Sequence, residues 1–287
     1  MLRDRTDLAG RRALLTGAGG GLGRTIAVAL AEQGVDLVLT DRPGTDLSGL
    51  SRDLGSRGVR VATLDADLTD RAAASDLVRR AEEALGPLDI LINNAGIEFV
   101  APWHDRTPEN LAFEVDLNLV APMLLTHAVL PGMVERGRGH VLTISSIGGM
   151  MAIPYLIGYA ASKHGIAAFN RALAAEVGDK GIAITTVFPG LIRDAGMGAN
   201  YTGALTPGVL ERVATRTPAA VGRAVVRGLR TGRNEVVVSA TPTRPIAVLT
   251  AIRPSASIRL MQRILRWGAP RVDAHLAEAR SRADGQQ

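Results

Sequence analysis

The chain has 287 residues, of which 46% are hydrophobic and 3% aromatic, and its formal net charge is +5. The hydrophobic share is enough for a sizeable core, and the absence of cysteine excludes disulfides, thiolate metal sites and a cysteine nucleophile. No basic stripe interleaves with aromatic residues, which argues against a nucleic-acid surface. Residues 1–7 have no apolar run of the kind a signal peptide needs, and no stretch approaches the roughly 18 apolar residues of a membrane span. We therefore expect a cytoplasmic protein without a metal site.

The first predicted elements are a short buried strand at 12–16, a glycine-rich turn at 16–23 and a helix with apolar residues at Ile26, Ala27, Leu30 and Ala31. This order is the context that a dinucleotide-binding loop requires. Glycines let the backbone approach a pyrophosphate, and the start of the helix offers free N–H groups to it. Gly17, Gly21 and Gly23 are the spaced set.

A second strand is predicted at 35–40, and Asp41 follows it. A carboxylate at this position can accept hydrogen bonds from both ribose hydroxyls of the adenosine and repel a 2′-phosphate, which favours NAD over NADP. The neighbouring Arg42 leaves NADP open, because a guanidinium can bind that phosphate. In the alternative interpretation, Asp41 only begins a turn before Pro43 and Gly44.

The next segments continue to alternate: a helix at 46–57, a strand at 59–64, a helix at 71–85 and a strand at 88–92. Asp67 follows the third strand, where it either meets the adenine amino group or caps the next helix. The fourth strand runs into Asn93-Asn94-Ala95-Gly96. Strands and helices that alternate in this way predict one doubly wound α/β domain with a parallel sheet and right-handed crossovers.

Residues 108–136 are predicted to form one or two helices with a bend at Pro122, and they include Asn118. A strand at 139–144 ends at Ser145-Ser146. The pattern closes with a strand at 182–188 that leads into Pro189-Gly190, a helix at 219–230 and a strand at 235–239. Between them, residues 191–216 are rich in small residues and are expected to form a mobile lid.

Tyr159 and Lys163 are four residues apart and would share one face of a helix. A free phenol has a pKa of about 10, and a neighbouring ammonium stabilises the phenolate and lowers that value. The pair is therefore a candidate general acid and base. Taken alone, the same spacing also fits an ordinary solvated helix face.

Together these motifs resemble the short-chain dehydrogenase/reductase family over roughly residues 8–239. The resemblance rests on Thr-Gly-x-x-x-Gly-x-Gly at 16–23, Asn-Asn-Ala-Gly at 93–96, Asn118, Ser146, Tyr-x-x-x-Lys at 159–163 and Pro-Gly at 189–190. It implies a Rossmann fold, an NAD(P)-dependent oxidoreductase and a homodimer or homotetramer. Ser146 matches the family's spacing to the tyrosine, with Ser145 as the alternative, since strand alternation lets only one of them face the site.

The resemblance also implies roles for individual residues. Tyr159 would exchange a proton with the substrate oxygen, Ser146 would hydrogen-bond that oxygen, and Asn118 would hold a water that relays protons from Lys163. Lys163 would lower the pKa of Tyr159 and hold the nicotinamide ribose. The implied cofactor-binding positions are Gly17, Gly21, Leu22, Gly23, Asp41, Arg42, Asp67, Leu68, Asn94, Ala95, Gly96, Tyr159, Lys163, Pro189, Gly190 and Ile192.

Two positions depart from expectation. Where the family usually has a threonine that contacts the carboxamide, four residues beyond Gly190, this chain has Asp194. Glu98 follows the Asn-Asn-Ala-Gly turn and is interpreted as a rim charge; if it faces the pocket, it would bind a substrate hydroxyl or amine. The predicted pocket wall is apolar, which favours a bulky secondary alcohol or ketone; it consists of Ile97, Phe99, Met150, Met151, Ile153, Tyr155 and Leu156.

Residues 240–287 form a basic extension whose eight arginines and three acidic residues account for the whole net charge. Within 257–267, Ile258, Met261, Ile264 and Leu265 would lie on one helical face. We favour packing or subunit contact for this face, with peripheral membrane contact as the alternative. Two further hypotheses stay open: a non-catalytic dinucleotide-binding regulator or scaffold on the same fold, and an enzyme delivered to lipid by this extension.

Overall fold

The computed structural model describes residues 7–193, 215–259 and 261–263. Within them, seven parallel strands form one sheet in the order β3-β2-β1-β4-β5-β6-β7. The strands are β1 (Arg12–Thr16), β2 (Asp36–Asp41), β3 (Val61–Asp65), β4 (Ile90–Asn93), β5 (Gly139–Ile144), β6 (Ile182–Pro189) and β7 (Glu235–Val238). All seven predicted strands are present, each within about two residues of its expected bounds. The doubly wound fold is therefore confirmed.

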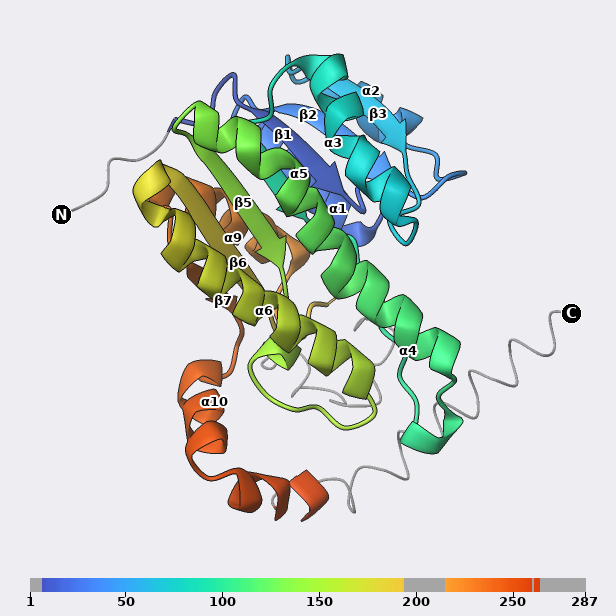
Figure 1. Cartoon of the computed structure of the whole chain (residues 1–287), viewed down its shortest axis with the longest axis vertical. Coiled ribbons are helices and arrows are strands. Elements are labelled where there is room, and N and C mark those ends of the chain that lie inside the picture. Colours follow the sequence, from blue (N-terminus) through green and yellow to red (C-terminus); the bar gives the residue numbers. More distant parts are fainter. Residues whose placement is uncertain (1–6, 194–214, 260, 264–287) are drawn as a thin grey trace, which may run out of the picture.

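Helices cover both faces of the sheet (Figure 1). The longer helices are α1 (Gly21–Ala31), α2 (Ser48–Gly55), α3 (Arg71–Leu85), α4 (Pro108–Val115), α5 (Ala121–Glu135), α6 (Ile157–Val177), α9 (Pro218–Thr231) and α10 (Thr243–Ile252). Apolar side chains of α1, α2 and α9 pack with the strands on one face, and those of α3, α5 and α6 pack on the other. The sheet is buried from both sides, which explains why its strands read as apolar runs.

The predicted helical region 108–136 is continuous but not uniform. A π-helical segment, Asp116–Val120, joins α4 to α5, and Pro122 lies in the first turn of α5. Pro122 lies inside the joined helix, where its missing N–H cannot donate to the preceding turn, and the π-helical irregularity falls in that turn, as the expected interruption at Pro122 requires. The irregular part is the π-helical segment itself, and it carries Asn118.

The joined helix Pro108–Glu135 is long and apolar enough to span a membrane by composition. This corrects the expectation that no such stretch exists. In the structure, α5 contributes Leu125, Val129 and Met133 to the core beside the sheet, so the apolar character of the helix serves packing. Of the most apolar window of this helix, 39% is buried inside the structure.

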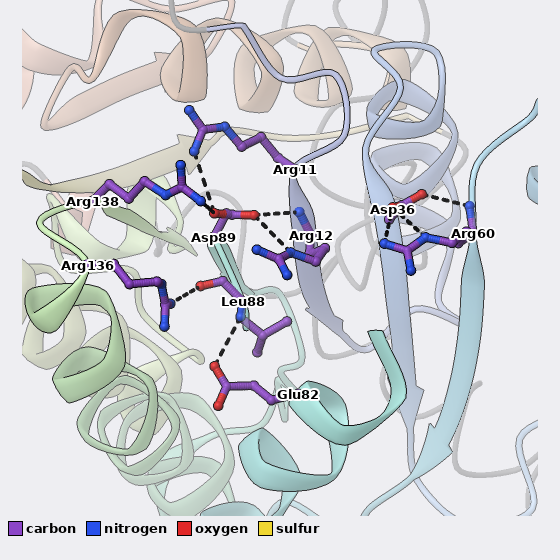
Figure 2. A network of polar contacts seen from close by, with 9 residues as sticks. All are labelled: Arg11, Arg12, Asp36, Arg60, Glu82, Leu88, Asp89, Arg136 and Arg138. Atoms are coloured by element: carbon purple, nitrogen blue, oxygen red, sulfur yellow. Dashed lines mark hydrogen bonds and ion pairs between the residues drawn. The ribbon is translucent and has the colours of Figure 1, made fainter. Parts of the chain in front are cut away.

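The amino-terminal edge of the sheet is held by ion pairs and backbone hydrogen bonds (Figure 2). Asp89 accepts hydrogen bonds from the backbone N–H and Nε of Arg12, at 3.1 and 3.2 Å, and lies 3.5 and 3.6 Å from Arg11 and Arg138. Arg60 likewise pairs with Asp36 at 2.8 Å, across β2 and β3. These contacts tie neighbouring strands together at the edge opposite to the predicted site.

Candidate active site

The glycine turn between β1 and α1 has no room for side chains, so a ligand can approach its backbone closely. Gly17 has a φ of +65°, and a Cβ there would lie 2.8 Å from the Cα of Ala95; a Cβ at Gly23 would overlap the carbonyl of Gly17. The first residues of α1 have no side-chain cap, so their N–H groups remain available to an anion. The turn therefore fits a dinucleotide pyrophosphate.

Asn94 and Thr16 lock this turn to the end of β4. The Thr16 hydroxyl accepts hydrogen bonds from the backbone N–H groups of Asn94 and Ala95, both at 3.0 Å. The Asn94 amide donates to the carbonyls of Thr16 and Gly17 at 2.9 and 3.1 Å. Sequence reasoning included Thr16 only as the first letter of a motif, whereas the structure shows that it joins the two loops.

Asp41 holds the other side of the glycine turn. One carboxylate oxygen accepts from the Gly19 N–H at 2.8 Å, and the other accepts from the Arg42 N–H at 2.8 Å. Asp41 thus does more than begin a turn, because it carries a negative charge to the loop. Two arginines are neighbours of this loop: Arg42 follows Asp41 in the chain and is exposed, and the Arg24 guanidinium donates to the Gly19 carbonyl at 2.9 Å.

At the end of β3, Asp67 is exposed and its carboxylate accepts from the N–H and hydroxyl of Thr69, which lowers its pKa. Asp70, and not Asp67, caps α3. Leu68 between them is buried. The end of β3 lies beside that of β2, since the Ala66 N–H donates to the Asp41 carbonyl at 2.9 Å.

Tyr159 and Lys163 lie on α6 and are both buried, with 7% and 3% of their surface exposed. Ser146 hydrogen-bonds the Tyr159 hydroxyl. Ser145 instead donates to the Lys163 carbonyl at 3.1 Å. Strand alternation therefore places Ser146, and not Ser145, beside the phenol.

Lys163 lies close to the turn at 93–96. Its Nζ donates to the Ile144 carbonyl at 3.2 Å and lies 5.5 Å from the centre of the Tyr159 ring. A Cβ on Gly96 would be 3.3 Å from the same nitrogen. The absence of a side chain at Gly96 is thus what lets the amine reach this turn.

The expected effect of Lys163 on Tyr159 is not seen in the chain alone. Burial raises the pKa of Tyr159; the hydrogen bond from Ser146 lowers it, and the negative charges of Glu98 and Glu114 raise it further. Burial also lowers the pKa of Lys163 to about 8, so the amine is still mostly protonated at neutral pH and loses its positive charge as the pH rises through 8. The phenol is therefore a protonated acid in the chain alone, and not an easily formed phenolate.

Asn118 is buried in the π-helical segment with its side-chain amide fully engaged. Its oxygen accepts from the Ile97 N–H at 2.9 Å, and its NH2 donates to the Ile97 carbonyl at 2.8 Å and to the Ser162 hydroxyl at 3.2 Å. Ser162 in turn donates to the Tyr159 carbonyl at 2.8 Å. Asn118 thus fixes the segment after the 93–96 turn against α6, and Ser162 is a member of this site that the motif did not reveal.

Glu98 is not a rim charge. It is half-buried, and burial raises its pKa to about 7; Lys163 lowers that pKa and Glu114 raises it, so the three groups lie within electrostatic reach of one another. Its neighbour Phe99 is held on both sides, because its N–H donates to Glu114 at 2.8 Å and its carbonyl accepts from Arg106. No sequence pattern indicates that this loop points its carboxyl inward.

Arg106 and Glu114 form a buried ion pair, with 3% and 0% of their side chains exposed. A Cβ on Gly158 would run into Glu114, so the pair also sets how closely α6 approaches this loop. Sequence reasoning missed both residues, because they lie eight positions apart and across a helix start, where no periodicity pairs them.

The end of β6 completes the site. Gly190 donates to the Val238 carbonyl at 2.9 Å, and a Cβ on it would lie 3.0 Å from the Ser239 hydroxyl. Pro189 ends β6, and Ile192 is buried and bridges to Arg216. Asp194 and most of the expected lid, at 194–214, lie outside the described residues.

The expected pocket wall consists of half-buried side chains beyond β4 and β5. Ile153 lies near Gly148, which in turn lies against the Tyr159 ring. Tyr155 has a φ of +67° and is the only non-glycine residue among the described ones with a positive φ. Its carbonyl accepts a hydrogen bond from the Ala101 N–H at 3.1 Å. A bulky residue in this conformation indicates strain of about 1–3 kcal/mol, held by the surrounding contacts.

Comparison with known proteins identifies the family. Residues 11–204 match the family model for short chain dehydrogenases. Ketoacyl reductase HetN of a Nostoc species is 32% identical over 263 residues, which cover 91% of this chain and 90% of that protein. The structure of levodione reductase is 30% identical, with a TM-score of 0.74 over 82% of this chain and 98% of the other.

A further solved structure bears on the cofactor. A protein from Beutenbergia cavernae, with NADP bound at low occupancy, is 27% identical and has a TM-score of 0.71 over 82% of this chain and 96% of its own. The similar proteins are reductases and dehydrogenases, which supports an enzyme over the alternative of a non-catalytic regulator or scaffold. The chain belongs to the short-chain dehydrogenase/reductase family and is an NAD(P)-dependent oxidoreductase.

Proposed function

We propose that this enzyme interconverts a secondary alcohol and a ketone on a bulky, largely apolar substrate, with Tyr159 as the general acid and base. The observation that carries this proposal is the meeting of Tyr159, Ser146 and Lys163 beside the 93–96 turn and the glycine turn. A nicotinamide bound there would supply or accept the hydride. The chain's own residues position the substrate oxygen and move its proton.

In the reductive direction, the Tyr159 hydroxyl donates its proton to the carbonyl oxygen as hydride reaches the carbon. In the oxidative direction, the phenolate takes that proton back from the alcohol. Ser146 hydrogen-bonds the same oxygen and holds it for transfer. Because burial raises the pKa of Tyr159, the chain alone keeps the phenol in its donor form.

The proposed role of Lys163 is to bind the nicotinamide ribose and to support the phenolate when it forms. Its lowered pKa, about 8, lets it release and recover a proton near neutral pH, so it can serve as the next member of a proton relay. Asn118 would act mainly by holding Ile97 and Ser162 in place, since its side-chain amide already makes three hydrogen bonds. A water that relays protons from Lys163 would then contact atoms of the π-helical segment other than the Asn118 side chain.

We propose NAD as the preferred cofactor. The carboxylate of Asp41 is held at the glycine turn, where it would accept from the ribose hydroxyls and repel a 2′-phosphate. Arg24 and Arg42 are the residues that would favour NADP instead, because a guanidinium can bind the 2′-phosphate. Paired titrations of the protein with NADH and NADPH decide between them, and Asp41→Asn should raise the affinity for NADPH relative to NADH.

The proposed activity is tested by following nicotinamide absorbance with panels of apolar ketones and alcohols. Tyr159→Phe should abolish turnover while it leaves NADH binding unchanged. Binding of NADH without turnover of any panel member would contradict the proposed substrate class. We also expect a homodimer or homotetramer, in which the exposed Phe113, Met123 and Ile157 would be covered; light scattering measures this.

A further inference from the structure

The C-terminal extension exposes an apolar surface that the body does not cover. From residue 244 to 259, every residue is exposed or half-exposed. The large apolar side chains among them are Ile246, Val248, Leu249, Ile252 and Ile258, which are 40% to 71% exposed. The described part of the extension thus does not pack on the body of its own chain, while the expected subunit contact stays a prediction. Ile264 and Leu265 of the predicted helical face lie outside the described residues.

The charged residues that the extension places near this apolar surface are arginines, of which Arg244 is paired with Glu235 of β7 at 3.6 Å. Residues 236–272 contain six arginines and no Asp, Glu or Lys. In the described part, Arg244 and Arg253 flank the apolar run Ile246–Ile252, and Arg259 and Arg263 follow it; Arg253, Arg259 and Arg263 are exposed. Arginines at both ends of an apolar run can keep their charged heads in water while their stems rest on a hydrophobic phase.

The position of the extension relates it to the active site. α10 follows β7 at the same edge of the sheet as the carboxyl ends of the strands, as Figure 1 shows. The connection begins at Ser239, whose hydroxyl lies beside Gly190 of the predicted cofactor site. An occupant of the apolar surface would therefore lie on the same side of the sheet as the candidate active site.

We propose that α10 and the described residues that follow it, 253–259 and 261–263, bind the surface of an anionic lipid membrane. α10 has ten residues, so at about 1.5 Å per residue it is far too short to cross a bilayer and would lie in the interface. A second copy of this extension is a poorer occupant, because a two-fold contact would bring arginines against arginines. Anionic headgroups match the arginines, and acyl chains match the exposed isoleucine and leucine side chains.

The first test is co-sedimentation of the full chain with vesicles of phosphatidylcholine, with and without phosphatidylglycerol. Binding should require phosphatidylglycerol and weaken as salt increases. Arg253→Gln with Arg259→Gln should lose binding by roughly fivefold for each charge removed. Leu249→Glu with Ile252→Glu should also lose binding, because it puts two carboxylates into the apolar surface. The control is Arg223→Gln with Arg227→Gln on the exposed side of α9, which lowers the net charge by the same amount and should bind normally.

The second test uses the absence of cysteine in the chain. Ile252→Cys is labelled with a dye that is sensitive to polarity, and Ser75→Cys on α3 is the matched control. Anionic vesicles should shift the emission of the dye at position 252 to shorter wavelength and leave that at position 75 unchanged.

Three outcomes would overturn the proposal. The protein could stay in the supernatant with both lipids and the dye could show no shift. The α9 control could lose as much binding as the extension variants, which would indicate a general charge effect. Finally, Leu249→Glu with Ile252→Glu could dissociate an oligomer in light scattering without changing lipid binding, which would assign the surface to a contact between copies.

Discussion

The two edges of the sheet differ in whether their buried titratable groups are ion-paired. At the amino-terminal edge, Asp89 is matched by Arg11, Arg12 and Arg138, and Asp36 by Arg60 (Figure 2). At the carboxyl edge, Tyr159, Lys163 and Glu98 are brought together with no direct ion pair among them in the described residues, and the pKa of each is shifted by burial. The two aspartates of the first edge are ion-paired and hold strands together, whereas these three groups of the second edge have no ion pair within the described part of the chain and lie away from their usual protonation states.

This difference follows from what each edge does. A paired carboxylate is stabilised in one ionisation state, which suits a structural contact. A buried group without a close partner lies nearer to a change of protonation state, which suits proton transfer, and such groups gather at active sites. The comparison predicts that changes at the carboxyl edge affect turnover, while changes at the amino edge affect stability.

The largest expected effect is on turnover. Tyr159→Phe should lower kcat by about 100-fold to 10,000-fold, because it removes the proton that the proposed reaction transfers. Stability should change little, since the ring stays in place. Steady-state kinetics and urea unfolding measure the two effects. A variant that kept its kcat would remove Tyr159 from the mechanism and end the proposed contrast.

At the amino edge, lowering the pH should destabilise the fold through His140. Burial lowers the pKa of His140 to about 4, and its Nε2 lies 2.7 Å from the Thr185 hydroxyl. Because the unfolded chain takes up the proton first, this stability is present above pH 6.5 and is lost as the pH falls toward 4. The full loss is on the order of 3 kcal/mol.

Urea unfolding at several pH values checks this loss in the wild type and in His140→Gln. The variant should lose less stability than the wild type between neutral and acidic pH. The exposed His104 provides the control, since His104→Gln should follow the wild-type curve. An equal pH dependence in all three proteins would show that other groups are responsible.

Asp89→Asn should lower the free energy of unfolding by about 2–3 kcal/mol, because it weakens charged hydrogen bonds to Arg12. The kcat should stay unchanged. As a control, Asp53→Asn breaks an exposed pair with Arg57 and should lower stability by at most about 1 kcal/mol. If the two variants are equally stable, the network in Figure 2 contributes no more than a surface ion pair.

The smallest expected effect is a shift in a pH profile. Glu98 raises the pKa of both Tyr159 and Lys163, so Glu98→Gln should lower both. The alkaline limb of kcat/KM should then move to lower pH by up to about one unit. Glu109→Gln, on the exposed first turn of α4, is the control. If the pH profile of kcat/KM is the same in Glu98→Gln as in the wild type, then Glu98 does not affect the groups that transfer the proton.

The sequence alone determined the order of the elements and the motifs at the strand ends. Alternating apolar runs, the glycine turn and the spacing of Tyr159 and Lys163 are local patterns, and the sheet assembles them at one edge because its strands are parallel. Alternation along a strand indicates only that one of Ser145 and Ser146 faces the site; the preference for Ser146 came from the spacing of the family's motif, and the structure places Ser146 beside the phenol.

Only the tertiary structure decided how these groups behave. The raised pKa of Tyr159, the inward position of Glu98 and the pairing of Arg106 with Glu114 depend on burial and on charges from several elements. The exposure of Leu249 and Ile252 likewise depends on whether another element covers them. Desolvation and long-range contact are properties of the packed chain, and no local pattern in the sequence records them.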